Sequence, residues 1–316
     1  MQEVISQAIQ SVLTLLLMGS LGFYFERRGW AGPKVKEFLP VLVIRAALPL
    51  YLFSTTVRDL TKGEIPRIVT DAGVAAISII ITFTISMLVF KIAKMERSRR
   101  GIFCVAFTFS NTMFIGMPIN LALFGDQALP HVISYFFFNS FCFWTIGNYM
   151  MSLDVPGRPA AILSRATLKR LFSPPIVGFL VGLLVIYFSI PLPRFFTQAA
   201  SSIGAMTTPV AIIYIGMGLA DLSWSSFKLD KDLILMISGR FLICPLVTLL
   251  ACLAFNLPTL TSQVYFIQSS LPVVASCSIL AGYYRSDTVF AVMVVSITTL
   301  MSIITVPIFR IITSFF

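Results

Sequence analysis

Long apolar stretches recur along the whole chain and are separated by short polar connections. A membrane-spanning helix needs about 20 mostly apolar residues, and ten stretches come close to this length or exceed it. They are 4–25, 38–57, 67–90, 101–124, 131–153, 174–190, 196–220, 233–255, 262–282 and 288–312. The pattern predicts an all-α membrane protein with ten transmembrane helices and no separate soluble domain.

The fourth stretch contains residues that interrupt a helix in the middle of an apolar run. Ser110, Asn111 and Thr112 are followed closely by Gly116 and Pro118. Proline removes a backbone donor that lipid cannot replace, so such a break is tolerated only where the backbone packs inside protein or lines a cavity. In secondary transporters, broken helices form the substrate site near the middle of the bilayer. The segment therefore predicts a broken helix and a candidate substrate site.

Features of the first half of the chain return in the second half at an offset of 160 residues. Pro49 in the second stretch corresponds to Pro209 in the seventh, and Ser110 corresponds to Ser270, which is followed by Pro272. Two halves of five helices must have opposite topology, because five is odd. We therefore expect two inverted five-helix repeats, with helices 4 and 9 broken and crossing near the midplane. The predicted parts are a first repeat at 1–153, a cytoplasmic linker at 154–173 and a second repeat at 174–316.

Basic residues are distributed unevenly between the two sets of connections. Those after odd-numbered stretches hold 16 Lys and Arg, the others and the chain end hold 5, and Arg45 and Arg240 lie inside stretches. By the positive-inside rule, the basic set faces the cytoplasm. This predicts a multi-pass protein of the inner (cytoplasmic) membrane with both termini extracytoplasmic. The net charge of +10 then reflects topology, and we expect no nucleic-acid partner.

The reactive side chains argue against an enzyme. All five cysteines fall in apolar stretches without a Cys-x-x-Cys pair, and His131 is the only histidine. These residues are too few for a zinc site or a Ser-His-Asp triad. The acidic residues lie in connections or near the ends of stretches, with Asp71 the deepest. We predict that the chain is not an enzyme and holds no metal or cofactor.

The segment Asn111-Thr112-x-x-x-Gly116-x-Pro118 closely resembles the signature of the fourth helix in the auxin efflux carrier family, whose bacterial members include malate- and malonate-type permeases. One departure is Cys277, which stands where plant members often have a second proline in helix 9. Matches elsewhere extend the resemblance to essentially the whole chain. They are Tyr24-Phe25-Glu26-Arg27-Arg28-Gly29-Trp30, Ala47-Leu48-Pro49, Phe124-Gly125-Asp126, Asn139 with Trp144-Thr145-x-Gly147, Pro174-Pro175 with Gly178, and Gly216-x-Gly218-Leu219-Ala220.

The resemblance implies a scaffold domain from helices 1, 2, 6 and 7 and a transport domain from helices 3–5 and 8–10. It also implies a homodimer that moves small organic anions, such as malate, malonate or auxin-like acids, by alternating access. A sodium-coupled bile-acid-type symporter of similar architecture is one alternative. A passive channel or sensor is another, although the chain lacks the rings of charge or repeated filter typical of channels.

The residues around the two predicted breaks are candidates for substrate binding. Asn111 either donates a hydrogen bond to substrate or bonds a neighbouring helix, and the same two interpretations apply to Asn139. Gly116 permits close approach of the crossing backbone, and Pro118 suits the first turn of a restarted half-helix. The candidate substrate-binding residues are Asn111, Thr112, Gly116, Pro118, Ser276, Ser278 and Asn139.

Charge at the site would come from helix ends and from two deep arginines. Half-helices that restart after Pro118 and around Ser276 would present unpaired amides, each end equivalent to about half a positive charge. Arg45 and Arg240 each stand about 12 Å from the basic-side end of their stretch at the rise of a helix. They are possible charge partners of the substrate, or they snorkel or pair structurally. These features predict a small organic anion as substrate.

Overall fold

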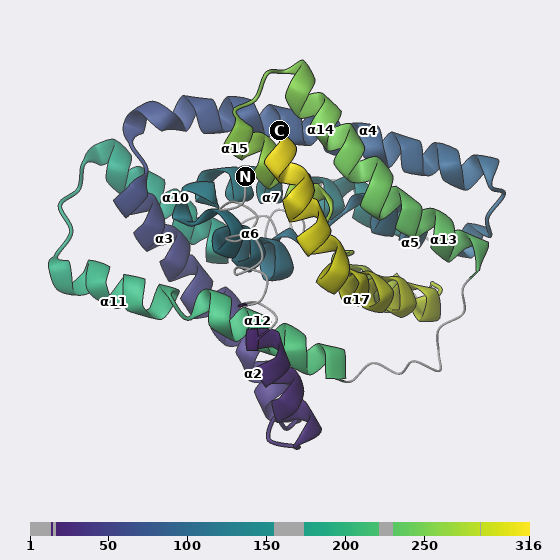
Figure 1. Cartoon of the computed structure of the whole chain (residues 1–316), viewed down its shortest axis with the longest axis horizontal. Coiled ribbons are helices and arrows are strands. Elements are labelled where there is room, and N and C mark those ends of the chain that lie inside the picture. The colour runs from purple at the N-terminus through teal and green to yellow at the C-terminus, as the bar shows by residue number, and fades with distance from the viewer. Residues whose placement is uncertain (1–13, 15–16, 155–173, 221–229, 285) are drawn as a thin grey trace. The chain divides into compact units, whose positions relative to one another are not determined.

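The computed structural model describes residues 14, 17–154, 174–220, 230–284 and 286–316. Figure 1 shows that the described elements are helices. Strand-type pairing among them is limited to an isolated bridge between single residues. The described part of the predicted linker 154–173 is Asp154 alone, and the first stretch, 4–25, is described only in part. The all-helical class is confirmed.

The helical elements alternate between α-helices and short π- or 3-10 segments. Residues 17–27 are helical, and the elements that follow are α2 (Pro33–Leu42), η1 (Val43–Ala47), α3 (Leu48–Asp59), η2 (Lys62–Glu64), α4 (Ile65–Ile92), η3 (Arg97–Arg99), α5 (Arg100–Thr108), η4 (Thr112–Gly116), α6 (Met117–Phe124), η5 (Asp126–Ala128), α7 (Leu129–Cys142), η6 (Phe143–Gly147), α8 (Asn148–Ser152), α10 (Pro174–Phe188), α11 (Arg194–Gly204), α12 (Thr207–Ala220), α13 (Lys231–Ser238), η8 (Gly239–Ile243), α14 (Cys244–Ala254), α15 (Thr259–Ser269), α16 (Ser276–Tyr284), α17 (Thr288–Ile312) and η9 (Thr313–Phe315).

Five described helical stretches are long and apolar enough to cross a membrane. They are Pro33–Arg58, Thr70–Ile92, Arg194–Gly218, Lys231–Ala254 and Thr288–Phe315. The helix Pro174–Phe188 is apolar but shorter. Helical residues occur in all ten predicted stretches, yet several of these stretches are interrupted. The count of ten transmembrane helices therefore remains a prediction.

Three prolines follow π-helical segments in the same way. Pro49, Pro118 and Pro245 are each the second residue of an α-helix that directly continues a five-residue π-helix, namely η1, η4 and η8. Proline lacks an N–H, and its ring clashes with the carbonyl four residues earlier in an α-helix. Because a π-turn bonds over five residues instead of four, it moves that carbonyl away from the ring. The helices therefore continue past these prolines.

Contacts divide the chain into two compact units, which are described separately. Unit 1 comprises Met1–Val69, Met117–Pro130 and Phe172–Leu222, and unit 2 comprises Thr70–Gly116, His131–Leu171 and Ser223–Phe316. In unit 1, α3 packs against α10 and α11, and α12 contacts α2 and α6 (Figure 1). The α3–α10 contact needs a glycine, because a Cβ at Gly178 would lie 2.3 Å from the carbonyl oxygen of Pro49. Unit 1 is thus built around tightly packed, largely apolar helices.

In unit 2, the short helix α5 lies among its neighbours and is buried over nearly its whole length. Every residue from Gly101 to Thr108 is buried, and α5 contacts α8, α13, α16 and α17. Phe103 packs against Phe107 within the helix and against Phe90 of α4. The end of α5 is therefore held in the interior of this unit.

A network of ion pairs joins the beginning of α5 to two other helices. Arg99 Nη1 lies 2.6 Å from Asp230 Oδ2 and 3.3 Å from Asp232 Oδ2, and Arg99 Nε lies 2.8 Å from Asp287 Oδ2. Asp230 and Asp287 also accept hydrogen bonds from the first turns of α13 and α17. Burial opposes ionisation of Asp230, but hydrogen bonds from Leu233 N–H and Arg99 hold its pKa below the ordinary value. One guanidinium thus connects the first turns of three helices.

Asp154 also binds the start of α5. Its carboxylate accepts a hydrogen bond from Gly101 N–H at 2.7 Å and lies 3.5 Å from Arg100 Nε. The carboxyl group is fully buried, and this burial raises its pKa to about 7 despite the nearby donors. The predicted linker therefore begins with a packed residue of unit 2.

Candidate functional site

Two interrupted helices meet within unit 2. After α5 ends at Thr108, Asn111 N–H donates to the carbonyl of Pro272 at 2.8 Å. Val274 N–H donates to the carbonyl of Phe109 at 3.1 Å, and Ser110 pairs with Val273 as an antiparallel bridge. The break after α5 and the break after α15 therefore bind each other through their backbones. We call residues 107–116 and 268–276 the crossover.

Asn139 of α7 binds the backbone of the first break. Its Nδ2 donates to the carbonyl of Ser110 at 3.0 Å, and its Oδ1 accepts from Ser110 N–H at 3.2 Å. Nδ2 also lies 3.4 Å from Thr112 Oγ1. The side-chain amide acts as a neighbouring strand would, satisfying both backbone groups of one residue. In this conformation Asn139 supports the crossover, and its polar atoms are occupied.

Arg240 of η8 joins the ends of the two interrupted helices. Its guanidinium is fully buried and donates to the carbonyl of Phe107 at 3.2 Å and to the carbonyl of Ser269. It also donates to Ser110 Oγ at 2.9 Å. Cations are favourable at helix C-termini, and Arg240 meets the C-terminal ends of both α5 and α15. The structure therefore favours structural pairing for this arginine over snorkelling.

Arg45 differs from Arg240 although both occupy a π-helix shortly before a proline. Arg45 lies in η1 of unit 1 and is exposed. Among the described residues it has no hydrogen bond or ion pair. The similar depth predicted for the two arginines thus corresponds to two different environments.

The first half-helix restarts earlier than the sequence predicted. We expected the restart after Pro118, but helical structure resumes at Thr112, and Gly116 N–H donates to the carbonyl of Asn111 at 2.9 Å. Pro118 is a buried second residue of α6 and is assigned to unit 1. The expectation was wrong because a π-turn carries the chain through the proline. Asn111 is therefore the residue before the restart, and its own N–H is already bonded.

The second half-helix, α16, begins with a more open first turn. Ala275 is exposed and Ser276 is half-buried. No described residue accepts a hydrogen bond from the N–H of Ala275 or Ser276, whereas Cys277 N–H donates to Val274 at 3.0 Å. Ser278 Oγ donates to the carbonyl of Ala275 at 2.9 Å, within its own helix. The first turn of α16 therefore has two N–H groups without an acceptor among the described residues.

Gln268 is a polar residue of the crossover that the sequence analysis did not single out. It is fully buried, and neither Oε1 nor Nε2 has a hydrogen-bond partner among the described residues. A Cβ at Gly116 would lie 2.3 Å from Gln268 Oε1 and 2.4 Å from Leu271 Cδ1. A buried amide left unpaired costs about 1–3 kcal/mol and requires an explanation. The sequence signal that could have identified Gln268 is a glutamine directly before Ser269 within an apolar stretch.

Asn111 also has a side-chain amide without a described hydrogen-bond partner. The residue is 8% exposed, and its N–H and carbonyl are both engaged in the backbone of the break. Thr112 beside it is buried and its hydroxyl faces Asn139. The crossover therefore holds two amide side chains, those of Asn111 and Gln268, with hydrogen-bonding capacity left over.

A second polar cluster lies on α4, α7 and α15. Thr261 Oγ1 is 3.4 Å from Asp71 Oδ2 and 3.2 Å from His131 Nδ1. Asp71 is buried, so the carboxylate that the sequence placed deepest is inside unit 2 rather than at its surface. Within the described ranges no three His, Cys, Asp or Glu side chains form a group that could hold a metal ion.

Comparison with known proteins gives matches over nearly the full chain. A family model described as membrane transport protein matches residues 7–310. An uncharacterized transporter of Methanocaldococcus jannaschii is 22% identical over 299 residues, covering 93% of this chain and 95% of the relative. An uncharacterized transporter of Methanothermobacter thermautotrophicus is 24% identical over 311 residues, covering 96% and 97%.

Proposed function

Because this chain belongs to the membrane transport protein family, that of the auxin efflux carriers, we propose that it is a secondary transporter that moves small organic anions by alternating access. Its membership of this family and its long apolar helices identify the chain as a multi-pass membrane transporter. The observation that carries the finer proposal is the crossover of two broken helices, with the amides of Asn111 and Gln268 unpaired among the described residues. Small carboxylates such as malate, malonate or auxin-like acids are the proposed substrates.

The charge of the crossover supports an anionic substrate. Residues 107–116 and 268–276 contain no acidic side chain. The first turn of α16 provides N–H groups that can bind a carboxylate, and two amide side chains can donate further hydrogen bonds. A substrate carboxylate would meet hydrogen-bond donors and the positive end of a helix. A cation would find no carboxylate there, and Arg240 already binds the C-terminal ends of α5 and α15.

The division into two units supports alternating access. Unit 1 gathers the predicted helices 1, 2, 6 and 7 of the scaffold, and unit 2 gathers most of helices 3–5 and 8–10. One difference is that α6, the second half of helix 4, groups with unit 1. The boundary between Gly116 and Met117 would then be a place where the proposed transport motion bends helix 4.

The location and assembly of the transporter are also proposed from the sequence. The asymmetry of basic residues supports insertion in the cytoplasmic membrane with both termini outside. We propose a homodimer assembled through unit 1, since the scaffold is the part that stays fixed during transport in this mechanism.

Uptake of radiolabelled malate and malonate into proteoliposomes tests the proposed function. We expect saturable uptake that is stimulated by unlabelled substrate on the opposite side. Amide analogues of the same acids should compete poorly, because they lack the charge. Flux without saturation or trans-stimulation would indicate a channel, and preference for a cation over every carboxylate would contradict the anion assignment. Parallel runs with and without sodium, at two pH values, identify the coupling ion.

Replacing Gln268 by methionine is expected to stabilise the protein and to reduce transport strongly. The substitution keeps the side chain's length and removes two unpaired polar atoms, so the free energy of unfolding should rise by about 1–3 kcal/mol. Substrate would lose an amide partner, and uptake should fall at least about tenfold, the factor that a contact of about 1.4 kcal/mol supplies. Thermal unfolding in detergent and uptake at equal protein density measure the two effects.

Gln263 on the same helix is the matched control. Its Nε2 donates to the carbonyls of Thr313 and Phe316 at 2.8 and 3.0 Å. Gln263→Met should therefore lower stability, the opposite of the change expected at Gln268. A loss of stability in Gln268→Met would show that its amide is bonded structurally, and wild-type uptake would remove it from the substrate site.

A further inference from the structure

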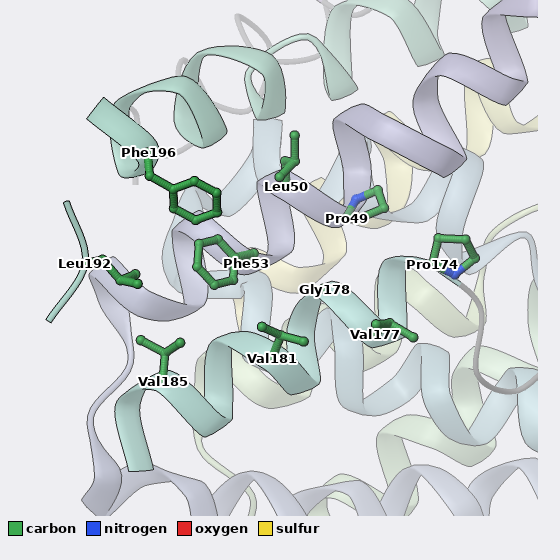
Figure 2. A pocket seen from close by; sticks show the side chains of 10 residues that line it. All are labelled: Pro49, Leu50, Phe53, Pro174, Val177, Gly178, Val181, Val185, Leu192 and Phe196. Atoms are coloured by element: carbon green, nitrogen blue, oxygen red, sulfur yellow. The ribbon is translucent and has the colours of Figure 1, made fainter. Parts of the chain in front are cut away.

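Unit 1 contains an apolar groove of about 660 Å³ between α3, α10 and α11. Figure 2 shows Val177, Val181 and Val185 of α10 in a row along one side, with Leu50, Phe53 and Phe196 on the other. The valines recur every four residues and so share one face of the helix. From the start of α10 to Val185 the groove follows about 17 Å of helix. Its shape suits an extended hydrocarbon chain.

A second cavity of about 650 Å³ adjoins the groove at Pro174, which lines both. The second cavity is lined by Val41, Ile44 and Arg45. Arg45 is exposed and has no ion-pair partner among the described residues. Pro174 is the first residue of α10, so the positive end of that helix lies at the same place. Positive charge is therefore concentrated where the apolar groove begins.

We propose that this surface binds an anionic phospholipid, with one acyl chain in the groove and the phosphate at Arg45. A guanidinium binds phosphate oxygens in a bidentate manner, and the groove supplies the apolar wall that a chain needs. The predicted topology places Pro174 directly after the cytoplasmic linker, at the inner face of the membrane. The groove would then run from the cytoplasmic headgroup region into the bilayer, which is the orientation of an inner-leaflet lipid.

The amphipathic character of the surface favours a phospholipid over other occupants. An unpaired arginine inside an apolar stretch is costly in lipid, and long basic side chains reach towards headgroups to avoid this cost. A purely apolar occupant of the groove would leave Arg45 without an anion. A soluble anion would leave the exposed Val177 and Val181 without a partner. The inner-leaflet orientation of the lipid rests on the proposed topology, whereas the surface itself is separate from the crossover.

Lipid binding to the purified full-length protein tests the proposal. Phosphatidylglycerol and phosphatidylcholine with identical acyl chains are titrated in detergent, and bound lipid is counted by native mass spectrometry. We expect phosphatidylglycerol to bind about tenfold more tightly, the effect of one added charge-assisted contact. Arg45→Gln should lower phosphatidylglycerol binding to the level of phosphatidylcholine. Lys34→Gln removes an exposed charge outside both cavities and should keep the preference.

The groove is tested separately from the charge. Val181→Phe fills the groove and should weaken binding of both lipids, whereas Leu184→Phe, on the same helix but outside the groove, should weaken neither. Equal binding of the two lipids by the wild type, or an unchanged preference in Arg45→Gln, would overturn the proposal. Competition by glycerol phosphate alone would assign Arg45 to a soluble anion. A change of oligomeric state in Val181→Phe, without lipid binding in the wild type, would assign the groove to a second copy of the chain.

Discussion

Substitution of Arg240 by methionine is expected to lower the free energy of unfolding by about 3 kcal/mol, because the buried carbonyls of Phe107 and Ser269 and the hydroxyl of Ser110 each lose a charged donor, at about 1–3 kcal/mol per group. The guanidinium is fully buried and bonds Ser269, Ser110 and Phe107 at once. Without it, the C-terminal carbonyls of two interrupted helices lose a donor in the buried interior of unit 2. The gain from removing a buried charge offsets only part of this loss. The apparent Tm in detergent and the yield of monodisperse protein measure the effect.

Two further variants separate charge from geometry. Arg240→Lys keeps the charge but offers a single ammonium in place of a planar fork, so it should recover only part of the stability. Arg45→Met removes the other deep arginine, which has no described partner, and should leave the Tm in lipid-free detergent nearly unchanged. Wild-type stability of Arg240→Met would show that the two helix ends do not need this cation.

Asn111 in the crossover and Asn139, which binds its backbone, should respond to alanine in opposite ways. Asn111→Ala is expected to abolish uptake while the protein stays folded, because its side-chain amide has no described partner and little packing area. Asn139→Ala is expected to destabilise the protein by about 1–3 kcal/mol, because the buried N–H of Ser110 loses its acceptor. The Ser110 carbonyl keeps the hydrogen bond from Thr112 N–H at 2.9 Å. Uptake into proteoliposomes and thermal unfolding of the same samples measure both effects.

Thr112 provides a control for the Asn139 variant. Among the described residues its hydroxyl makes only the long 3.4 Å contact with Asn139, so Thr112→Val should cost less stability than Asn139→Ala. If Asn111→Ala instead loses the fold, or transports at the wild-type rate, then its amide is structural and the substrate site lies elsewhere in the crossover.

The breaks could be predicted from the sequence because their signals are local. A proline, a glycine and polar residues close together in an apolar run disfavour a continuous helix whatever surrounds them. The second break was predicted through the same residue types at Pro272 and Ser276. The all-helical class followed equally directly, since only internal hydrogen bonding is tolerated in lipid.

The roles of individual side chains could not be predicted, because they depend on partners far away in the chain. Arg240 was recognised as deep, but its acceptors at Phe107 and Ser110 are about 130 residues away. The restart at Thr112 depends on a choice between α- and π-type bonding, for which the sequence offers no local signal. The lack of a hydrogen-bond partner for the Gln268 amide can be recognised only from the three-dimensional positions of its neighbours.

The π-helical segments have a consequence for how chain length can vary in evolution. A π-turn contains one residue more than the α-turn that would replace it, so deleting a single residue there restores an α-helix and keeps both flanking helices in register. The same deletion inside α4 would rotate everything beyond it by about 100°. At η1, η4 and η8 the following proline requires the extra residue. At η6 no proline follows, since Asn148 and Tyr149 come next, so Phe143–Gly147 is where related sequences can differ by one residue while their helices remain aligned.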